Sequence, residues 1–431
     1  MSLGEALAYA RVHQPAIRAA IARIEAQAAQ AKVPSAQWYP TVGATAQLFA
    51  ATANNTTGSY VSAGVVDIPR IGGTRATGSG SSLAPYASSL VGAGVRQELF
   101  DFGRITAQTA AEDALTDVTR QRSRSITLDV SFNVEEAYFS VFAARAILKA
   151  SQDAYDRSLV HRDLAKAGVS SGLRSPIELT RADADLANFD IGRIRAAGGL
   201  TIARAVFAAT VGVPDPALEV SVAPPAPSEL PDLTSAMQQA EARDPRLLEA
   251  FAQFRAAERA TRAIAAELRP NLSLTGTISG RAGAAPPSGT GSLPDGGGFL
   301  PSVPNWDVGV VLNWPLFDGV ISARTDASRA REQVRKEEIG VVREDSRVSI
   351  REAYAAVGVA RTVLPGLHRA VDSARANYAQ ADARFKAGLG TSVELADAEG
   401  LRTEAEIRLV LGEFELARTR AAFGRAIAEG L

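Results

Sequence analysis

The stretch WDVGVVLNW, residues 306–314, alternates between apolar side chains and polar residues or glycine, with only Val311 out of phase. An earlier stretch, NLSLTGTI at 271–278, keeps the same period of two, and residues 42–48 and 91–98 repeat it more weakly. Side chains of a strand point alternately to the two faces of its sheet, so this period predicts strands with one apolar face. A tryptophan at both ends, here Trp306 and Trp314, is typical of membrane-interface aromatics on a transmembrane barrel strand. An ordinary half-buried antiparallel sheet would show the same alternation.

Two long segments connect these strands in pairs, Ala50–Ser89 and Arg281–Pro304. Both are rich in Gly, Ser, Thr, Asn and Pro and have almost no apolar periodicity. Long irregular connections are uncommon inside compact domains, but they are usual on the outer face of a membrane barrel. The loops therefore favour the barrel, although a disordered insertion would have a similar composition.

The chain carries an internal duplication, because six short segments recur in the same order. The pairs are His13–Arg18 with Arg243–Leu248, Tyr39–Val42 with Arg269–Leu272, Leu99–Asp101 with Leu316–Asp318, Glu136–Tyr138 with Glu352–Tyr354, Lys166–Gly168 with Lys386–Gly388, and Ile177–Leu179 with Val393–Leu395. Their offsets are 230, 230, 217, 216, 220 and 216 residues. Such drift is expected where loops differ in length. The change of offset from 220 to 216 implies that the first of two helical turns has four more residues than the second, around Arg174 and Ser175.

Each half has the expected order helix, strand, loop, strand, very long helix, turn, long helix. Periodicity and prolines predict the first helices over 3–32 and 233–268. Alanine-rich helical sequence with mixed charge fills 103–166 and 319–386, and the returning helices cover 176–211 and 392–428. Helices of some sixty residues, about 90 Å long, must pair as antiparallel coiled-coil hairpins. The divisions are 1–37 (helix), 38–102 (strands 1 and 2), 103–213 (hairpin), 214–232 (Pro-rich linker), 233–268 (helix), 269–318 (strands 3 and 4) and 319–431 (hairpin).

Composition excludes several classes of protein. The chain has 431 residues with 46 basic and 47 acidic side chains, which gives no charge imbalance suited to nucleic acid. It has no cysteine, so it has no disulfide and no thiolate metal site. The most apolar helical run, 201–213, is short and contains Arg204. If this chain crosses a membrane, we expect it to do so with strands.

Four membrane strands cannot close on themselves, and an open edge in lipid leaves backbone groups unpaired at several kcal/mol each. Subunits must therefore pool strands. Two chains would give eight strands, a barrel filled by its own side chains, whereas three would give twelve, enough for an open lumen. A conduit is therefore expected to be a trimer at least.

The chain resembles the TolC-like outer membrane factor family, the outer membrane efflux proteins, over nearly its whole length. LFDFGR at 99–104 and PLFDG at 315–319 are similar to the family's "PLFDGG" segment, AYF at 137–139 to its "AYF" segment, and RFKAGLGT at 384–391 to its "RYxAGxxs" turn. The resemblance implies a mixed α+β membrane protein: a homotrimer with a twelve-stranded β-barrel in the outer membrane of a Gram-negative bacterium, continuous with a periplasmic α-helical barrel. It further implies a channel for tripartite efflux or type I secretion, with a periplasmic adaptor (membrane fusion) protein and an inner-membrane pump as partners. No secretory signal is visible at the N terminus, so we expect the sequence to be a mature or engineered form.

The resemblance also assigns residues. Gly168 and Gly388 are expected to end the long helices at the periplasmic tips. The adaptor contacts it implies are Arg162, Leu164, Gly168, Arg384, Gly388 and Leu389. The gate and tunnel-lining residues it implies are Glu394, Asp397, Phe385 and Glu178. Glu394 and Asp397 lie three residues apart on one helix face; in a trimer they would form two carboxylate rings that attract cations, although acidic residues also favour a helix N-terminus for its dipole alone.

No enzyme is predicted. His13, His161 and His368 are far apart on helix surfaces, and GTGS at 289–292 lacks the lysine and preceding strand of a phosphate loop. No catalytic residue, cofactor or metal site is therefore assigned. The alternative to a channel is a soluble or peripheral coiled-coil scaffold with the strands as a capping domain. It would explain the absent signal sequence, but not the strands bounded by tryptophan.

Overall fold

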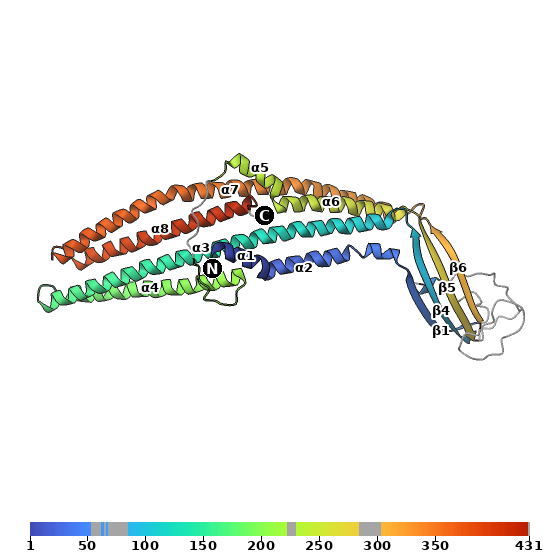
Figure 1. Cartoon of the computed structure of the whole chain (residues 1–431), viewed down its shortest axis with the longest axis horizontal. Helices are drawn as coiled ribbons and strands as arrows, with labels where there is room; N and C mark the ends of the chain where they lie inside the picture. The colour runs from blue at the N-terminus through green and yellow to red at the C-terminus, as the bar shows by residue number, and fades with distance from the viewer. Residues whose placement is uncertain (53–61, 64–65, 68–84, 222–229, 284–302, 430–431) are drawn as a thin grey trace, which may run out of the picture. The chain divides into compact units, whose positions relative to one another are not determined.

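In the computed structural model the described residues are 1–52, 62–63, 66–67, 85–221, 230–283 and 303–429. They form two compact units, whose elements are labelled in Figure 1. The sheet unit comprises residues 27–116 and 254–334, and the helical unit comprises residues 1–26, 117–253 and 335–431. Two long helices, α3 (Arg104–Ser170) and α7 (Gly319–Lys386), contribute to both units.

The sheet unit contains the four antiparallel strands that the alternation predicts. They are β1 (Thr41–Thr52), β4 (Pro85–Phe100), β5 (Asn271–Gly283) and β6 (Val303–Asn313), in the spatial order β1-β4-β5-β6 (Figure 1). Two-residue strands β2 (Ser62–Ala63) and β3 (Val66–Asp67) pair separately. The strands extend further into the expected loops than the sequence indicates, β4 by five residues before 90, and the remainder of both loops lies outside the described residues. Trp314 follows β6 and is not part of it.

The register places apolar residues on one face of this sheet. One row across it contains Val42, Val95, Gly276 and Val308, and a neighbouring row contains Ala44, Ala93, Ile278 and Trp306. A row on the opposite face of the sheet is polar or glycine and contains Thr41, Arg96, Thr275 and Gly309. Side chains on the apolar face are open to their surroundings: Val42 is 73% exposed, Val308 68% and Trp306 77%. Within the described residues this face therefore has no protein layer over it.

The aspartate of each Leu-Phe-Asp segment caps the start of the long helix that follows it. The Asp101 carboxylate accepts hydrogen bonds from the backbone N–H groups of Gly103, at 2.9 Å, and Ile105. The Asp318 carboxylate accepts from those of Val320 at 2.7 Å and Ile321 at 3.2 Å. The first N–H groups of a helix have no partner inside it, so an aspartate at this position stabilises the helix start. The repeated segment thus marks the change from strand to helix.

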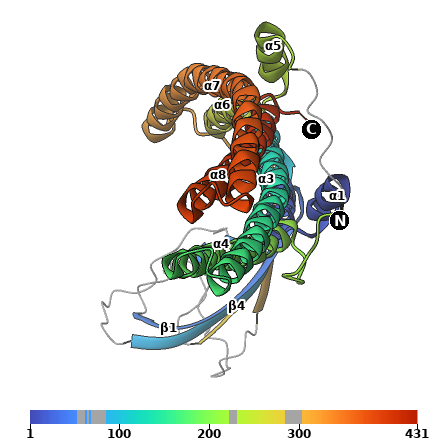
Figure 2. The same cartoon turned by 90° about the vertical axis from the view of Figure 1, so that its left-hand side faces the viewer.

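The long helices return as hairpins, α3 with α4 (Pro176–Val211) and α7 with α8 (Ser392–Ala426); Figure 2 shows each pair side by side. Pro365 lies inside α7, and the helix continues through it. In the helical unit, Tyr138 of the Ala-Tyr-Phe segment is 1% exposed and packs against Phe207 of α4, with ring centroids 5.7 Å apart. That segment is therefore part of a hydrophobic core.

The predicted helices 3–32 and 233–268 are each broken. The structure has α1 (Leu3–His13), α2 (Pro15–Gln30) and the 3₁₀ turn η1 (Pro34–Trp38) in one half, and α5 (Leu233–Arg243), α6 (Pro245–Ala265) and η2 (Ala266–Leu268) in the other. Gln14 and Asp244 have ψ values of 123° and 112°, outside the helical range. Proline disfavours the helical conformation in the preceding residue, so Pro15 and Pro245 each start a new helix.

The expected four-residue surplus in the first turn is wrong. Helices α3 and α7 end at Ser170 and Lys386, and α4 and α8 begin at Pro176 and Ser392, so both boundaries are 216 residues apart. The glycine in the left-handed conformation is Gly172 (φ 71°), equivalent to Gly388 (φ 74°). Gly168 is helical, and the Lys-Ala-Gly match at an offset of 220 is out of register.

The expectation that only strands are apolar enough to span a membrane is too strong. One described helix, α4, is long and apolar enough to cross a membrane when it is judged by length and composition alone. The same is true of core helices of soluble proteins, and the C-terminal half of α4 supplies buried Leu200, Phe207 and Val211 to the core around Tyr138. Helix packing therefore explains these three residues, whereas only 22% of the apolar 18-residue window of α4 is buried within the chain.

Gly172→Ala is expected to lower the free energy of unfolding by about 1–2 kcal/mol, because a Cβ is strained at positive φ. Gly198→Ala is the matched control, since Gly198 lies inside α4 with no atom within 4 Å of an added Cβ. There alanine should be neutral or stabilising by about 0.5–1 kcal/mol. Urea unfolding of the detergent-solubilised chain measures both; equal effects of the two substitutions would contradict the assigned turn.

Candidate functional site: the tips of the hairpins

The two hairpin turns have the same backbone structure. In the first, the N–H groups of Leu173 and Arg174 donate to the carbonyl oxygen of Gly168 at 2.9 and 3.1 Å. In the second, those of Leu389 and Gly390 donate to the Arg384 carbonyl oxygen at 2.9 and 3.1 Å. Leu173 and Leu389 follow the left-handed glycines and are 84% and 75% exposed. Each tip therefore presents one exposed leucine.

Arg174 joins the two hairpins. Its Nη2 donates to the backbone oxygen of Phe385 at 2.6 Å, and its guanidinium carbon lies 3.8 Å from the centroid of the Phe385 ring. Its Nη1 contacts Glu178 Oε2 at 2.6 Å. Planar guanidinium groups suit this combination of aromatic stacking and directed hydrogen bonds. The predicted gate residues Phe385 and Glu178 are thus brought together, through an arginine that sequence reasoning had not assigned.

Gly168 makes room for this contact. A Cβ at Gly168 would lie 2.6 Å from Arg174 Cδ, closer than real Cβ atoms approach other atoms. The absence of a side chain at Gly168 therefore leaves the space that the Arg174 side chain occupies. This differs from the predicted role, which was to end the helix.

A buried ion pair connects the hairpins further along α3. Arg157 donates to Glu399 from Nε, at 3.0 and 2.9 Å to the two carboxylate oxygens, and from Nη2 at 2.6 Å to Oε1. The Glu399 side chain is 1% exposed, and Thr403 Oγ1 also donates to it at 3.1 Å. A buried carboxylate that loses its cation is left desolvated and unpaired. Glu399 therefore ties α8 to α3 strongly.

His161, four residues beyond Arg157 on α3, faces α7. Its Nε2 is 3.1 Å from the Tyr378 hydroxyl oxygen and 3.6 Å from Asp382 Oδ1. Burial raises the pKa of Tyr378 to about 12, so its hydroxyl stays protonated at pH 7. The tautomer of His161 decides which of the two groups donates the proton of this hydrogen bond. Burial also lowers the pKa of His161, with Asp382 opposing that shift. His161 is therefore neutral at pH 7.

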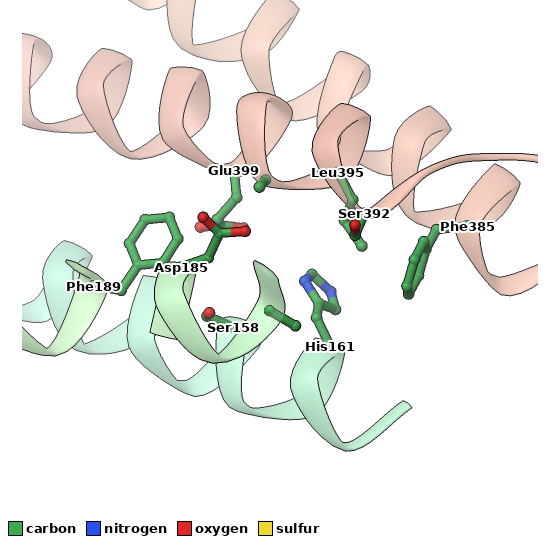
Figure 3. A pocket seen from close by; sticks show the side chains of 10 residues that line it. Ser158, His161, Asp185, Phe189, Phe385, Ser392, Leu395 and Glu399 are labelled. Atoms are coloured by element: carbon green, nitrogen blue, oxygen red, sulfur yellow. The ribbon is translucent and has the colours of Figure 1, made fainter. Parts of the chain in front are cut away.

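A small cavity of about 20 Å³ separates the hairpins, enough for one water molecule. Figure 3 shows His161 of α3 and Asp185 of α4 on one side of it and Ser392, Leu395 and Glu399 of α8 on the other. Burial, and next the nearby Asp397, raise the pKa of Asp185. The described residues contain no group of three His, Asp or Glu side chains arranged to hold a metal ion.

The remaining predicted gate and adaptor-contact residues lie near the tips without joining this cluster. Glu394 is exposed at the start of α8, 3.9 Å from Arg384 Nη2, and Asp397 is exposed one turn later. Leu164 is 37% exposed, and Arg162 contacts Asp163 at 3.0 Å. Sequence reasoning missed Gly172, Leu173 and Arg174 because it aligned the turns at an offset of 220. The flanking pairs at 216 contained the correct register.

Comparison with known proteins now decides the family. The model of the outer membrane efflux protein family matches residues 6–213 and 236–429, one stretch in each half. The chain belongs to the outer membrane efflux protein family. This family consists of channel-forming efflux proteins and not of enzymes, and it places the chain in the outer membrane of a Gram-negative bacterium, with the helical part on the periplasmic side. The resemblance stated from the sequence is confirmed.

Individual relatives agree with this assignment. Protein CyaE of Bordetella pertussis is 27% identical over 428 residues, covering 98% of this chain and 82% of CyaE. Structures of CusC and of the Campylobacter jejuni outer membrane channel CmeC share the fold, with TM-scores of 0.75 and 0.74 at 18% and 15% identity. The CusC match covers 99% of this chain and 92% of CusC, and the CmeC match 100% and 86%.

Glu399→Gln is expected to destabilise the chain by about 3 kcal/mol, because Arg157 loses its charged partner in a buried site. Glu394→Gln removes the same charge on the same helix, but from a side chain that is 51% exposed. Its effect should stay within about 0.5 kcal/mol. Urea unfolding compares the two variants, and the account of Glu399 fails if they unfold alike.

Proposed function

We propose that this chain is one subunit of a homotrimeric outer-membrane channel, a passive conduit in a tripartite efflux or type I secretion system. The observation that carries the proposal is the sheet of the sheet unit. Its apolar face is exposed, and its outer strands β1 and β6 each pair on one side only within the described residues. In lipid the apolar face would contact acyl chains, and the free edges would pair with those of two further copies. Three copies would give a twelve-stranded barrel.

Exposed aromatic residues support this placement. Trp306 and Trp314 are eight residues apart and 77% and 55% exposed. At about 3.3 Å per residue they are separated by about 26 Å along the strand direction. At the usual strand tilt of about 40° this is about 20 Å along the membrane normal, close to the roughly 25 Å apolar band of a membrane barrel. We propose that they lie at the two lipid interfaces.

The hairpin tips are proposed as gate and docking surface. A periplasmic adaptor protein would contact Leu173 and Leu389 together with Arg384 and Gly388, and would connect the channel to an inner-membrane pump. Two equivalent turns support equal use of both tips. Opening would separate the α7–α8 hairpin from the α3–α4 hairpin, so the contacts of Arg174 would break.

We expect the chain to require detergent for extraction and to migrate as a heat-sensitive oligomer. After reconstitution into a planar bilayer, the purified oligomer should conduct ions. A chain that stays soluble without detergent and does not conduct would instead be a coiled-coil scaffold.

Glu394→Gln combined with Asp397→Asn is expected to reduce cation selectivity and block by divalent cations, because two carboxylate rings near the closed end attract cations. Glu344→Gln combined with Asp326→Asn changes the net charge equally, at exposed positions on α7 and not on α8, and should leave selectivity unchanged. Reversal potentials in asymmetric salt measure both. Unchanged selectivity in the first variant would remove the two residues from the pore.

Arg174→Ala is expected to raise the open probability of the channel about tenfold, because loss of a charge-assisted hydrogen bond and a ring contact destabilises the closed form by roughly 1.4 kcal/mol or more. Arg195→Ala is the control, since Arg195 is an exposed arginine on α4, the helix that begins two residues after Arg174. Single-channel recording measures the effect. A closed channel in both variants would show that Arg174 does not restrain the hairpins.

A further inference from the structure

His161 lies where the two hairpins meet and is held by groups of both. It belongs to α3, and its two closest polar partners, Tyr378 and Asp382, belong to α7. Its side chain is 13% exposed. The adjoining cavity, of about 20 Å³, gives a water molecule room beside the ring. The ring is therefore largely buried between the hairpins, and the cavity beside it is large enough for one water molecule.

The carboxylates nearest to His161 are already paired with other cations. Lys386 Nζ contacts Asp382 Oδ2 at 2.7 Å, and Arg157 binds both oxygens of Glu399. A proton on His161 would add a third positive charge to this group without adding a negative one. Asp382 Oδ1 receives no hydrogen bond from the described residues and would favour the charged ring. At 3.6 Å it only partly offsets the cost of burying the charge.

Charged and titratable groups from all four helices face this histidine. They are Arg157 on α3, Asp185 on α4, Tyr378, Asp382 and Lys386 on α7, and Glu399 and Arg402 on α8.

We propose that protonation of His161 separates the two hairpins. The neutral ring packs in the closed arrangement, whereas the protonated ring drives the hairpins apart so that its charge becomes hydrated. This rests on the proposed gating function, because hairpin separation is the opening movement. The direction follows from linkage. Burial lowers the pKa of His161, so the closed form binds a proton more weakly than a separated form with a hydrated ring. Acidification below the ordinary histidine range, about pH 6.5, therefore favours separation.

Asp185 acts in the opposite sense. Burial and Asp397 raise its pKa, so in the closed form it takes up a proton more readily and acid would favour closure through this group. A substitution at His161 leaves Asp185 in place, so the two contributions can be told apart.

Hairpin separation can be measured directly, because the chain has no cysteine of its own. Spin labels at Leu173→Cys and Leu389→Cys mark the two exposed tips. Mixing labelled chains with an excess of unlabelled chains gives oligomers with one labelled copy, and pulsed electron paramagnetic resonance then reports the distance between tips. Between pH 7.5 and pH 5.5 we expect the separated population to rise about fivefold, the lower end of usual allosteric couplings.

His161→Gln keeps a partner for Tyr378 without a titratable charge, and its tip distances should not change with pH. His161→Arg carries a permanent charge and should show separated tips already at pH 7.5. His368→Gln replaces an exposed histidine and should behave as the parent chain. The proposal is overturned if His161→Gln retains the pH response, or if acid brings the parent tips together.

This measurement does not require ion flow. A chain that shows the His161-dependent movement but never conducts would contradict the channel function alone. A conducting chain without that movement would contradict only the proposed separation of the hairpins by protonation of His161.

Discussion

Backbone hydrogen bonding in lipid is the constraint on which the rest of this structure depends. A strand inside a membrane has no water to satisfy its N–H and C=O groups, so every strand needs two neighbours. Within the described residues, β1 and β6 have one each. The exposed apolar face of the same sheet, with Val42, Trp306 and Val308, excludes water as its stable surrounding. The proposed assembly, in which several copies pool their sheets, would resolve both features at once.

The strands and long helices could be predicted because each is fixed by a local pattern. Side-chain alternation at 271–278 and 306–313 determines which face is apolar, and the antiparallel register then aligns Gly276 with Val308 and Ile278 with Trp306. The capping aspartates Asp101 and Asp318 likewise act on residues within four positions of themselves. The breaks at Pro15 and Pro245 were also present locally in the sequence, but helical periodicity on both sides concealed them.

The candidate site was predictable only in part. Phe385 and Glu178 were assigned by resemblance, and the structure places Arg174 in contact with both. Arg174, Arg157 and His161 make their contacts across 211 to 242 residues of sequence, and no local period contains that information. The error in the turn register had a different cause. A three-residue match, Lys-Ala-Gly, was given equal weight with longer-range agreement at 216, although a helix end is decided by where a left-handed glycine can close it.

Three contacts at successive positions along α3 and its turn connect the two hairpins, and they differ in burial and in the number of hydrogen bonds. The Arg157–Glu399 pair is buried and multiply bonded, His161 is titratable, and Arg174 lies at the end, beside the turn. Separation would then begin at the tip and end at Glu399. All of it depends on an assembly in which the sheets are pooled, and the mass of the detergent-solubilised particle by native mass spectrometry tests that most directly. The account predicts a protein mass of three times 45.1 kDa; a stable particle of one or two chains would contradict it.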